Sequence, residues 1–155
     1  GYREVWLGGA SMGGMGALMH ERLYPGDVDG LLLLAPYLGG RAILKEIRDA
    51  GGLAQWTPGP VQPVTAKTWQ RELWRHLQGW GRDSARTRQV WLAYGDRDRL
   101  RDAIALLTPL LPADHVMVRS GGHTWTVWSP AAGDLLRRAD AATQENDSTA
   151  TQSLP

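Results

Sequence analysis

A short apolar stretch near the start of the chain runs directly into a glycine-rich turn and then into a helix-forming segment. Residues 5–7 (Val-Trp-Leu) have strand character, and residues 15–23 follow the turn without a proline. Between them, Gly9-Ala10-Ser11-Met12-Gly13 matches the pattern G-x-S-x-G, which places a serine on a tight strand-to-helix turn, the nucleophile elbow. A Cβ two residues before or after the serine would crowd the backbone, so we expect Gly9 and Gly13 to be required. The pattern predicts a strained Ser11 whose hydroxyl is pushed into the open.

Two other glycine-rich motifs do not fit this turn. No lysine follows Gly13, which excludes a phosphate-binding P-loop, and the spacing G-x-G-x-x-G of dinucleotide-binding folds does not occur here. The remaining alternative is a glycine-rich helix start that merely packs closely against a sheet. An exposed serine on such a turn is typical of proteins that cleave or transfer an acyl group.

Strand-like and helix-like segments alternate along the rest of the chain. Strands are predicted at 5–7, 28–35, 89–94 and 115–118, and helices at 12–23, 42–50, 65–80, 99–111 and 126–142. Residues 57–64 contain three prolines and are predicted to be irregular. This alternation predicts an α/β fold of three αβα layers around a mostly parallel sheet. We expect one domain over residues 1–142 and a disordered polar tail over residues 143–155.

Composition excludes several functional classes. The 155 residues carry 17 basic and 16 acidic side chains, a balance that gives no support for a nucleic-acid partner. The chain has no cysteine, so disulfides, thiol catalysis and cysteine metal sites are excluded, and we expect no metal site. No stretch is long and apolar enough to span a bilayer. The compartment stays open, with the cytoplasm favoured.

A serine nucleophile needs a base, and four histidines compete for that role. His20 lies in the first predicted helix, beyond the serine turn, and His76 lies in the helix predicted at 65–80. His115 begins a strand and is therefore expected at the amino-terminal edge of the sheet. His123 follows the last predicted strand after two glycines, so its loop can bend back across the carboxyl edge. Functional groups of parallel sheets gather at that edge, which favours His123 as the base.

The acid that orients the histidine is expected after the third predicted strand. Asp96 and Asp98 both follow residues 89–94 in the run Tyr-Gly-Asp-Arg-Asp at 94–98. Asp96 lies in the turn itself, where it can cap the backbone. Asp98 lies two residues further along, where a loop can direct it toward a histidine, and it is the preferred candidate. Both could also serve only as turn or helix-cap residues.

The order Ser11, Asp98, His123 is the order of nucleophile, acid and histidine in α/β-hydrolases. The chain resembles that superfamily from about residue 5 to about residue 136. More narrowly, it is similar to the esterase group that includes esterase D-like and feruloyl-esterase-like proteins. The resemblance rests on the motifs Gly-Ala-Ser-Met-Gly-Gly at 9–14, Tyr-Pro at 24–25, Gly-Asp-Arg-Asp at 95–98 and Gly-Gly-His-Thr-Trp-Thr-Val-Trp at 121–128. The resemblance implies hydrolysis of a small-molecule carboxylic ester without a cofactor, and its G-x-x-D spacing supports Asp98 over Asp96.

The chain departs from the family pattern at its amino end. Members of the superfamily have several strands before the elbow, whereas this sequence begins almost at the elbow strand and matches the carboxyl-terminal portion of the fold. One oxyanion donor is the N–H of the residue after the nucleophile, here Met12, but the second normally comes from an earlier loop. The first strand would also have an uncovered edge, which invites pairing with a second chain.

The hypothesis that follows is a serine esterase in which Ser11 attacks the ester, His123 takes its proton and Asp98 orients His123. Trp125 and Trp128 are the predicted pocket residues, together with the irregular segment at 55–64. Two alternatives remain open at this point. One is an impaired fragment or interaction module of an α/β-hydrolase, and the other is an acyltransferase that uses the same triad.

Overall fold

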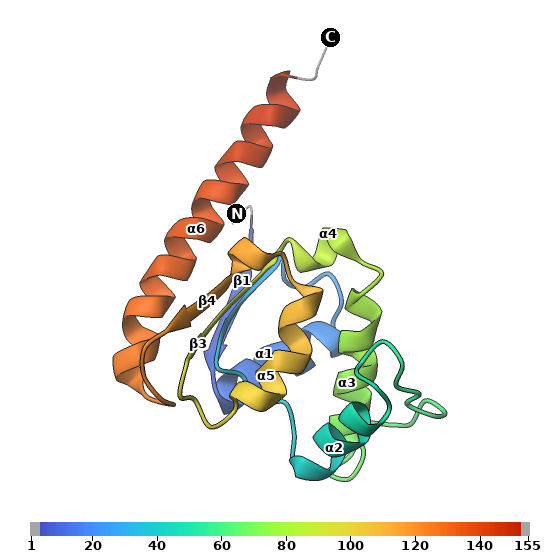
Figure 1. Cartoon of the computed structure of the whole chain (residues 1–155). Coiled ribbons are helices and arrows are strands. Elements are labelled where there is room, and N and C mark those ends of the chain that lie inside the picture. The colour runs from blue at the N-terminus through green and yellow to red at the C-terminus, as the bar shows by residue number, and fades with distance from the viewer. Residues whose placement is uncertain (1–3, 153–155) are drawn as a thin grey trace.

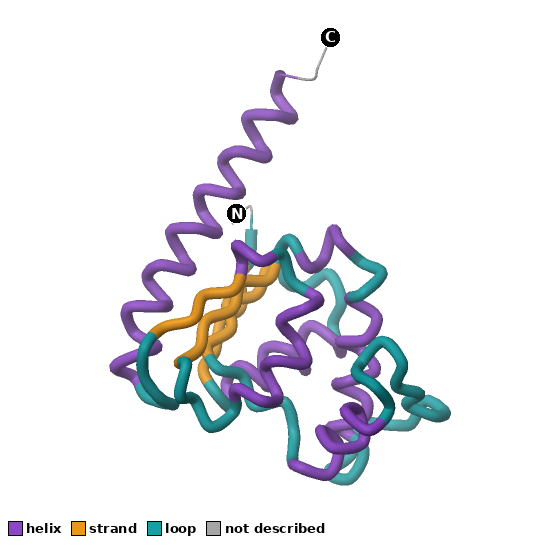
Figure 2. The backbone as a smooth tube through the Cα atoms, viewed as in Figure 1, coloured by secondary structure: helices purple, strands orange, loops and turns teal. Residues whose placement is uncertain are grey.

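Four parallel strands form the sheet, and they lie side by side in the order of the chain. A computed structural model describes residues 4–152. The strands are β1 (Trp6–Ala10), β2 (Gly30–Leu34), β3 (Val90–Gly95) and β4 (Val116–Arg119). Their registers pair Ala10 with Leu34, Leu34 with Ala93, and Gly95 with Arg119. The carboxyl ends of all four strands therefore meet at one edge, from which the loops in Figure 2 continue.

Helices cover both faces of this sheet, as the alternating sequence predicts. The longer helices are α1 (Met12–Leu23), α2 (Arg41–Asp49), α3 (Trp69–Trp80), α5 (Arg101–Leu107) and α6 (Trp125–Gln152). Figure 1 shows α6 on one side of the sheet and α1, α3 and α5 on the other. Contacts of α6 with β2, β3 and β4, and of α1 with β1 and β2, hold the three layers together. The predicted αβα architecture is confirmed.

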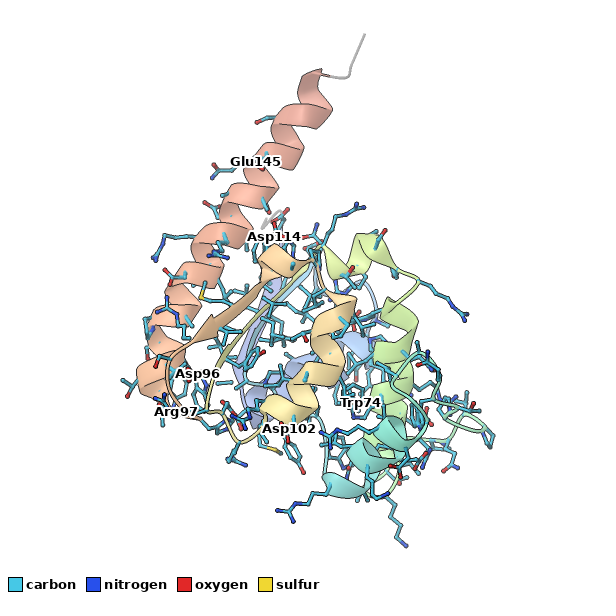
Figure 3. All side chains as sticks on the ribbon, in the orientation of Figure 1. Trp74, Asp96, Arg97, Asp102, Asp114 and Glu145 are labelled. Carbon is cyan, nitrogen blue, oxygen red and sulfur yellow. The ribbon has the colours of Figure 1, made fainter. Side chains whose placement is uncertain are left out.

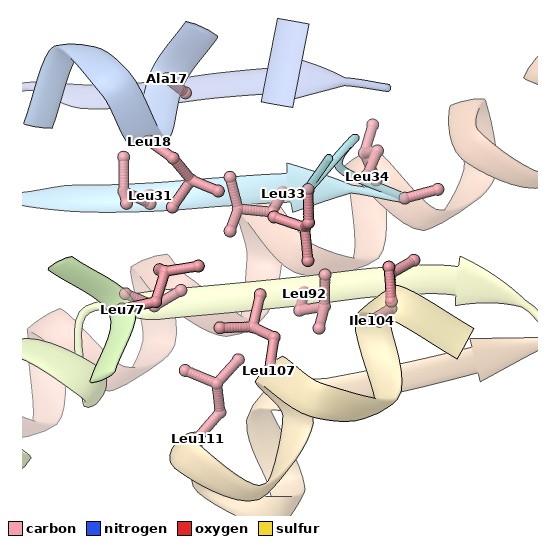
Figure 4. Packing of buried hydrophobic residues seen from close by; sticks show 14 of the residues in the cluster. Ala17, Leu18, Leu31, Leu33, Leu34, Leu77, Leu92, Ile104, Leu107 and Leu111 are labelled. Atoms are coloured by element: carbon pink, nitrogen blue, oxygen red, sulfur yellow. The ribbon is translucent and has the colours of Figure 1, made fainter. Parts of the chain in front are cut away.

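Leucine is the most frequent residue in the core between the sheet and the helices, followed by alanine and tryptophan. Strand β2 contributes the run of four leucines at 31–34, and β3 is buried along most of its length. Figure 4 shows Leu31, Leu33 and Leu92 packed among side chains of α1, α3 and α5. Such continuously apolar strands are expected where helices cover both faces of a parallel sheet. This packing fixes the strand ends that carry the candidate site.

Several element boundaries differ from the sequence predictions. The helix predicted over 99–111 is divided into α5 and a 3₁₀ turn at Thr108–Leu110, and the helix predicted from 65 begins at Trp69. A further one-turn helix, α4 (Ser84–Thr87), was not predicted. It is short and depends on one local cap, because the Asp83 carboxylate accepts a hydrogen bond from the Arg86 N–H at 2.9 Å. Residues 57–64 are irregular, as expected.

The segment expected to be a disordered tail continues α6 as far as Gln152. Residues 141–152 contain neither proline nor glycine, and Gln144 donates a hydrogen bond to the Asp140 carboxylate one turn earlier at 3.0 Å. Such i, i+4 pairs stabilise a helix even where it leaves the core. Figure 1 shows this end of α6 extending beyond the sheet. Residues 153–155 of the expected tail lie outside the described residues.

Strand β1 lies at one edge of the sheet, with β2 as its neighbour and no strand on its other side among residues 4–152. The uncovered edge expected from the sequence is thus present in the fold. No helix within the described part of the chain is long and apolar enough to cross a membrane.

Candidate active site

Ser11 stands between the end of β1 and the first residue of α1, in a backbone conformation that is rare for residues other than glycine. Its φ is 52° and its ψ is −116°. The Ser11 N–H donates to the Leu34 carbonyl at 2.9 Å, and the Ser11 carbonyl accepts from the N–H groups of Met15 at 3.1 Å and Tyr37 at 2.9 Å. These three bonds hold the turn in a conformation that costs on the order of 1–3 kcal/mol. The strained serine that the pattern predicts is found at this turn.

The glycines around Ser11 have different roles from those expected. A Cβ on Gly9 would lie 2.3 Å from the carbonyl carbon and oxygen of Gly13, so Gly9 is required. A Cβ on Gly13 would meet nothing within 4 Å, so the expectation that Gly13 avoids crowding is wrong. The close approach falls instead on Gly14, whose Cβ would lie 2.9 Å from the Cβ of Pro36. The reason is that Gly14 faces the loop after β2, whereas Gly13 is exposed.

Met12 is the first residue of α1, and its N–H has no acceptor among the described residues. This is normal for the first turn of a helix, where four N–H groups lack intrahelical partners. The free N–H follows the serine directly, which is the position that an oxyanion donor needs in this type of turn. The Met12 side chain is exposed, so it leaves this position open.

His123 lies in the loop between β4 and α6 and reaches back to the elbow. Its Nε2 is 2.8 Å from the Ser11 Oγ. Two glycines permit the approach of this loop to the end of β3, since a Cβ on Gly95 would lie 2.2 Å from the Gly121 carbonyl oxygen. Gly121 has a φ of +135°, a region that L-residues rarely adopt. The bend at the two glycines before His123 is expected from the sequence, whereas the role of Gly95 in making room for the loop is not.

Asp98 lies on the other side of the histidine ring. Both of its carboxylate oxygens are 2.9 Å from the His123 Nδ1. The Oδ1 also accepts a hydrogen bond from the Leu100 N–H at 2.8 Å, and the residue is 1% exposed. A buried carboxylate on Nδ1 holds a neutral histidine in the tautomer whose Nε2 can accept a proton. The structure thus brings together the three residues selected from the sequence.

Asp96, the alternative acid, has a different set of contacts. Its carboxylate accepts a hydrogen bond from the Gly121 N–H at 2.9 Å, and its own N–H donates to the Arg119 carbonyl at 2.8 Å. Asp96 is exposed and makes no hydrogen bond to His123. It therefore holds the histidine loop against the end of β3 rather than contacting the ring.

The other three histidines lie away from this edge. His115 is buried, stacks on Trp91 with ring centroids 3.7 Å apart, and its Nδ1 is 3.0 Å from the Val90 carbonyl oxygen. Asp114, next to it in the chain, appears in Figure 3 well separated from Asp96. His20 pairs with Asp27, and His76 pairs with Glu21.

The two tryptophans predicted for a pocket lie in contact with each other but have different surroundings. Trp128 is 6% exposed and meets the His123 ring edge-to-face, with centroids 4.6 Å apart. Trp125 is 66% exposed and lies edge-to-face with Trp128 at 5.2 Å. It also lines an apolar cavity of about 280 Å³ together with residues of β1, β2 and α6, Gly9 and Ala10 among them. Trp128 thus supports the histidine, while Trp125 faces open space next to the elbow strand.

The irregular segment 55–64 lies over α3. Arg75 donates hydrogen bonds to the carbonyls of Gly59 at 3.0 Å and Pro60 at 2.9 Å, and the Glu72 carboxylate accepts one from the Gln62 N–H at 3.2 Å. No hydrogen bond within residues 4–152 joins this segment to the loops of Ser11, Asp98 or His123. Across those same described residues, no group of three histidine, aspartate or glutamate side chains could hold a metal ion.

A protein-family match extends over most of the chain. The family described as "Putative esterase" matches residues 2–138. The chain belongs to this family. The match includes the elbow, the loop of Asp98 and the loop of His123, and it confirms the resemblance inferred from the sequence motifs. No curated protein sequence matches the chain.

Solved structures with the same fold include three esterases and hydrolases. A ferulic acid esterase is 20% identical with a TM-score of 0.51, and the matched region covers 85% of this chain and 49% of the esterase. An S-formylglutathione hydrolase from Staphylococcus aureus is 14% identical with a TM-score of 0.52, and the matched region covers 86% of this chain and 50% of the hydrolase. A carboxylesterase from the thaumarchaeon Nitrososphaera gargenis is 15% identical with a TM-score of 0.50, and the matched region covers 91% of this chain and 66% of the carboxylesterase. The esterase-family chain therefore spans about half the length of the first two, and it shares their fold.

Proposed function

We propose that this chain carries the catalytic machinery of a serine esterase that acts on small-molecule carboxylic esters. The observation that carries the proposal is the continuous line of hydrogen bonds from Asp98 through His123 to Ser11, at 2.9 and 2.8 Å. Membership of the esterase family supports the same reaction class. Serine, histidine and a buried carboxylate in this arrangement are the groups that acyl transfer to a serine requires.

In the proposed reaction, the Ser11 Oγ attacks the ester carbonyl carbon while the His123 Nε2 accepts the hydroxyl proton. The Met12 N–H donates to the oxyanion that forms on the carbonyl oxygen. Asp98 stabilises the positively charged imidazolium through the hydrogen bond to Nδ1. His123 then gives the proton to the leaving alcohol, and an acyl-enzyme remains on Ser11. Water, deprotonated by His123, attacks the acyl carbon; the bond to the Ser11 Oγ then breaks, His123 returns the proton to that oxygen, and the acid is released.

The test is hydrolysis of 4-nitrophenyl acetate by the protein and by its Ser11→Ala variant. We expect turnover that falls by about 10³-fold or more in the variant, because the nucleophile is lost. Equal turnover by the two proteins would exclude Ser11 as the nucleophile. Product analysis in the presence of a competing alcohol distinguishes hydrolysis from acyl transfer, since a transferase gives a new ester in place of the free acid.

The length comparison favours a second candidate, an incomplete catalytic unit. The chain spans 49% of the ferulic acid esterase and 50% of the S-formylglutathione hydrolase. Loss of one oxyanion donor costs roughly 10²–10³-fold in rate. Comparing kcat of this chain with that of a longer polypeptide that includes it separates the two candidates. Equal kcat values support a self-sufficient enzyme, and a kcat that is lower by that factor supports an incomplete one.

A further inference from the structure

A cavity lined by basic side chains lies next to Arg99 and Leu100, the two residues that follow Asp98 in the chain. It measures about 720 Å³ and lies between α2, the loop that precedes it, and the first residues of α5. Figure 1 shows α2 and the start of α5 at the same end of the molecule. The charged side chains that line the cavity are four basic ones and one acidic one: Arg41, Lys45, Arg48, Arg99 and Asp102. The charge of the lining is therefore strongly positive.

Three of these charged side chains already have partners. Lys45 pairs with Asp49 at 2.5 Å, and Arg48 donates a hydrogen bond to the Asp102 main-chain carbonyl at 3.0 Å. The Asp102 carboxylate lies 3.7 Å from the Nε of Arg101. These contacts lie along the sides of α2 and α5 and stabilise the cavity walls.

Arg41 and Arg99 are different. Neither guanidinium has a hydrogen-bond or ion-pair partner among residues 4–152, and both side chains are exposed. A guanidinium presents five N–H donors in a planar fork that matches the oxygens of a carboxylate or a phosphate. Two such groups without partners line this one cavity.

Two segments that line the cavity are also hydrogen-bonded to residues of the candidate triad. Arg99 and Leu100 directly follow Asp98, and the Leu100 N–H donates to the Asp98 carboxylate at 2.8 Å. Tyr37, which also lines the cavity, donates its N–H to the Ser11 carbonyl at 2.9 Å. A group bound in this cavity would therefore be positioned relative to the reacting serine.

The Tyr37 side chain adds a neutral donor, its hydroxyl, to the lining of the cavity. Its ring lies 6.0 Å from that of Trp69, and its hydroxyl has no hydrogen-bond partner within the described part of the chain. A phenolic hydroxyl can donate to an oxyanion or to an ester oxygen. The cavity thus combines two charged donors with one neutral donor.

From this arrangement we infer that the cavity binds an oxyanion group, a carboxylate or a phosphate, on the part of the ester that does not react. This role in substrate selection rests on the proposed esterase function. The proposal assigns Arg41 and Arg99 as the residues that bind the anionic group. Esters that carry a second, free acid group are then the preferred substrate class.

The kinetic test compares two 4-nitrophenyl esters, the anionic hemiglutarate and the neutral valerate. In the double variant Arg41→Gln/Arg99→Gln, we expect kcat/KM for the anionic ester to fall roughly 10-fold, the value of one lost charge-assisted hydrogen bond. The value for the neutral ester stays unchanged. Arg88→Gln is the matched control, because Arg88 is exposed, precedes β3 at the other edge of the sheet and lines no part of this cavity. No fall, or an equal fall for both esters, would overturn the role in selection.

A binding test that does not depend on activity separates this inference from the esterase proposal. The ¹⁵N-labelled protein is titrated at constant ionic strength with glutarate, inorganic phosphate and neutral glutaramide. We expect saturable shifts of the Gly39, Gly40 and Arg99 amides with an oxyanion but not with glutaramide, and their loss in the double variant. Shifts by glutarate alone identify a carboxylate site, and shifts by phosphate alone identify a phosphate site. Absence of shifts, or equal shifts with glutaramide, would overturn the site even in a protein that hydrolyses esters.

Discussion

The Asp96 carboxylate accepts a hydrogen bond from the Gly121 N–H at 2.9 Å, which joins the turn after β3 to the loop that carries His123. Asp98, two residues further along, contacts the histidine ring itself. The two aspartates of one short turn thus have separate roles. One positions the loop, and the other orients the ring and is the proposed catalytic acid.

This separation predicts different effects for two matched substitutions. Asp98→Asn is expected to lower kcat by about 10³–10⁴-fold, because an amide on Nδ1 favours the wrong histidine tautomer. Asp96→Asn keeps a carbonyl oxygen for the Gly121 N–H and is expected to keep kcat within about 10-fold of the original. Turnover of 4-nitrophenyl acetate measures both. A larger loss in Asp96→Asn than in Asp98→Asn would reverse the assignment.

Gly95 is predicted to be essential for the approach of the histidine loop. Gly95→Ala places a Cβ 2.2 Å from the Gly121 carbonyl oxygen, so backbone must move, and we expect a loss of about 2 kcal/mol or more in the free energy of unfolding. Gly16→Ala in α1 is the control, since its Cβ would meet nothing within 4 Å. That substitution should stabilise the protein by up to about 1 kcal/mol. Urea denaturation of the two variants checks both values, and equal stabilities would contradict the close packing at Gly95.

Ser11 itself is predicted to cost stability. Its φ of 52° suits glycine, so Ser11→Gly should be more stable than Ser11→Ala by about 1 kcal/mol, after the greater flexibility of glycine in the unfolded chain is counted. Both variants lack the hydroxyl, so the hydrogen bond to His123 cancels from the comparison. The urea midpoints of the two variants, compared at equal m-values, give the difference in their free energy of unfolding. If the alanine variant were the more stable one, the turn would not be strained.

Glu72 is predicted to contribute stability that depends on pH. Its side chain is fully buried. Burial acts to raise its pKa, but hydrogen bonds from Arg75 and the Gln62 N–H, with the charges of Arg75 and Arg22, hold the pKa below its ordinary value of 4.5. A lowered folded-state pKa gives stability that is present above the ordinary value and is lost as the pH falls through the folded pKa.

Removing this charge should therefore matter most near neutrality. Glu72→Gln is expected to lower the free energy of unfolding by about 3 kcal/mol at pH 7, because the buried arginine contacts lose their partner. The difference from the original protein should shrink as the pH falls below 4.5. Glu46→Gln is the control, since Glu46 pairs with Arg71 in a partly exposed position and should cost less than about 1 kcal/mol. A difference for Glu72→Gln that does not change with pH would contradict the charged contact.

The sequence was sufficient for the architecture because the buried strands are continuous apolar runs and proline or glycine separates many of the helices. It also identified the three residues that converge at the carboxyl edge, since each follows a strand. It did not identify Gly14 or Gly95, because their need for a missing side chain arises from segments distant in the chain, Pro36 and Gly121. Local sequence patterns do not contain those contacts.

Three other features could not be predicted from the sequence, for physical reasons. The helix α4 depends on a single cap by Asp83, and its four residues are too few for periodicity. The continuation of α6 to Gln152 has little apolar periodicity, so polar composition suggested disorder where local hydrogen bonds favour a helix. The basic cavity was also missed, because Arg41 and Arg99 are far apart in the chain and come together only in the fold.

Labelling with a fluorophosphonate probe, followed by mass spectrometry of the peptides, tests the role of Ser11 as the nucleophile most directly. We expect one covalent adduct on Ser11, abolished in Ser11→Ala and strongly slowed in His123→Gln, because only a serine activated by its histidine reacts readily with such probes. An adduct on another residue, or labelling that persists in Ser11→Ala, would contradict the assignment of Ser11 as the nucleophile.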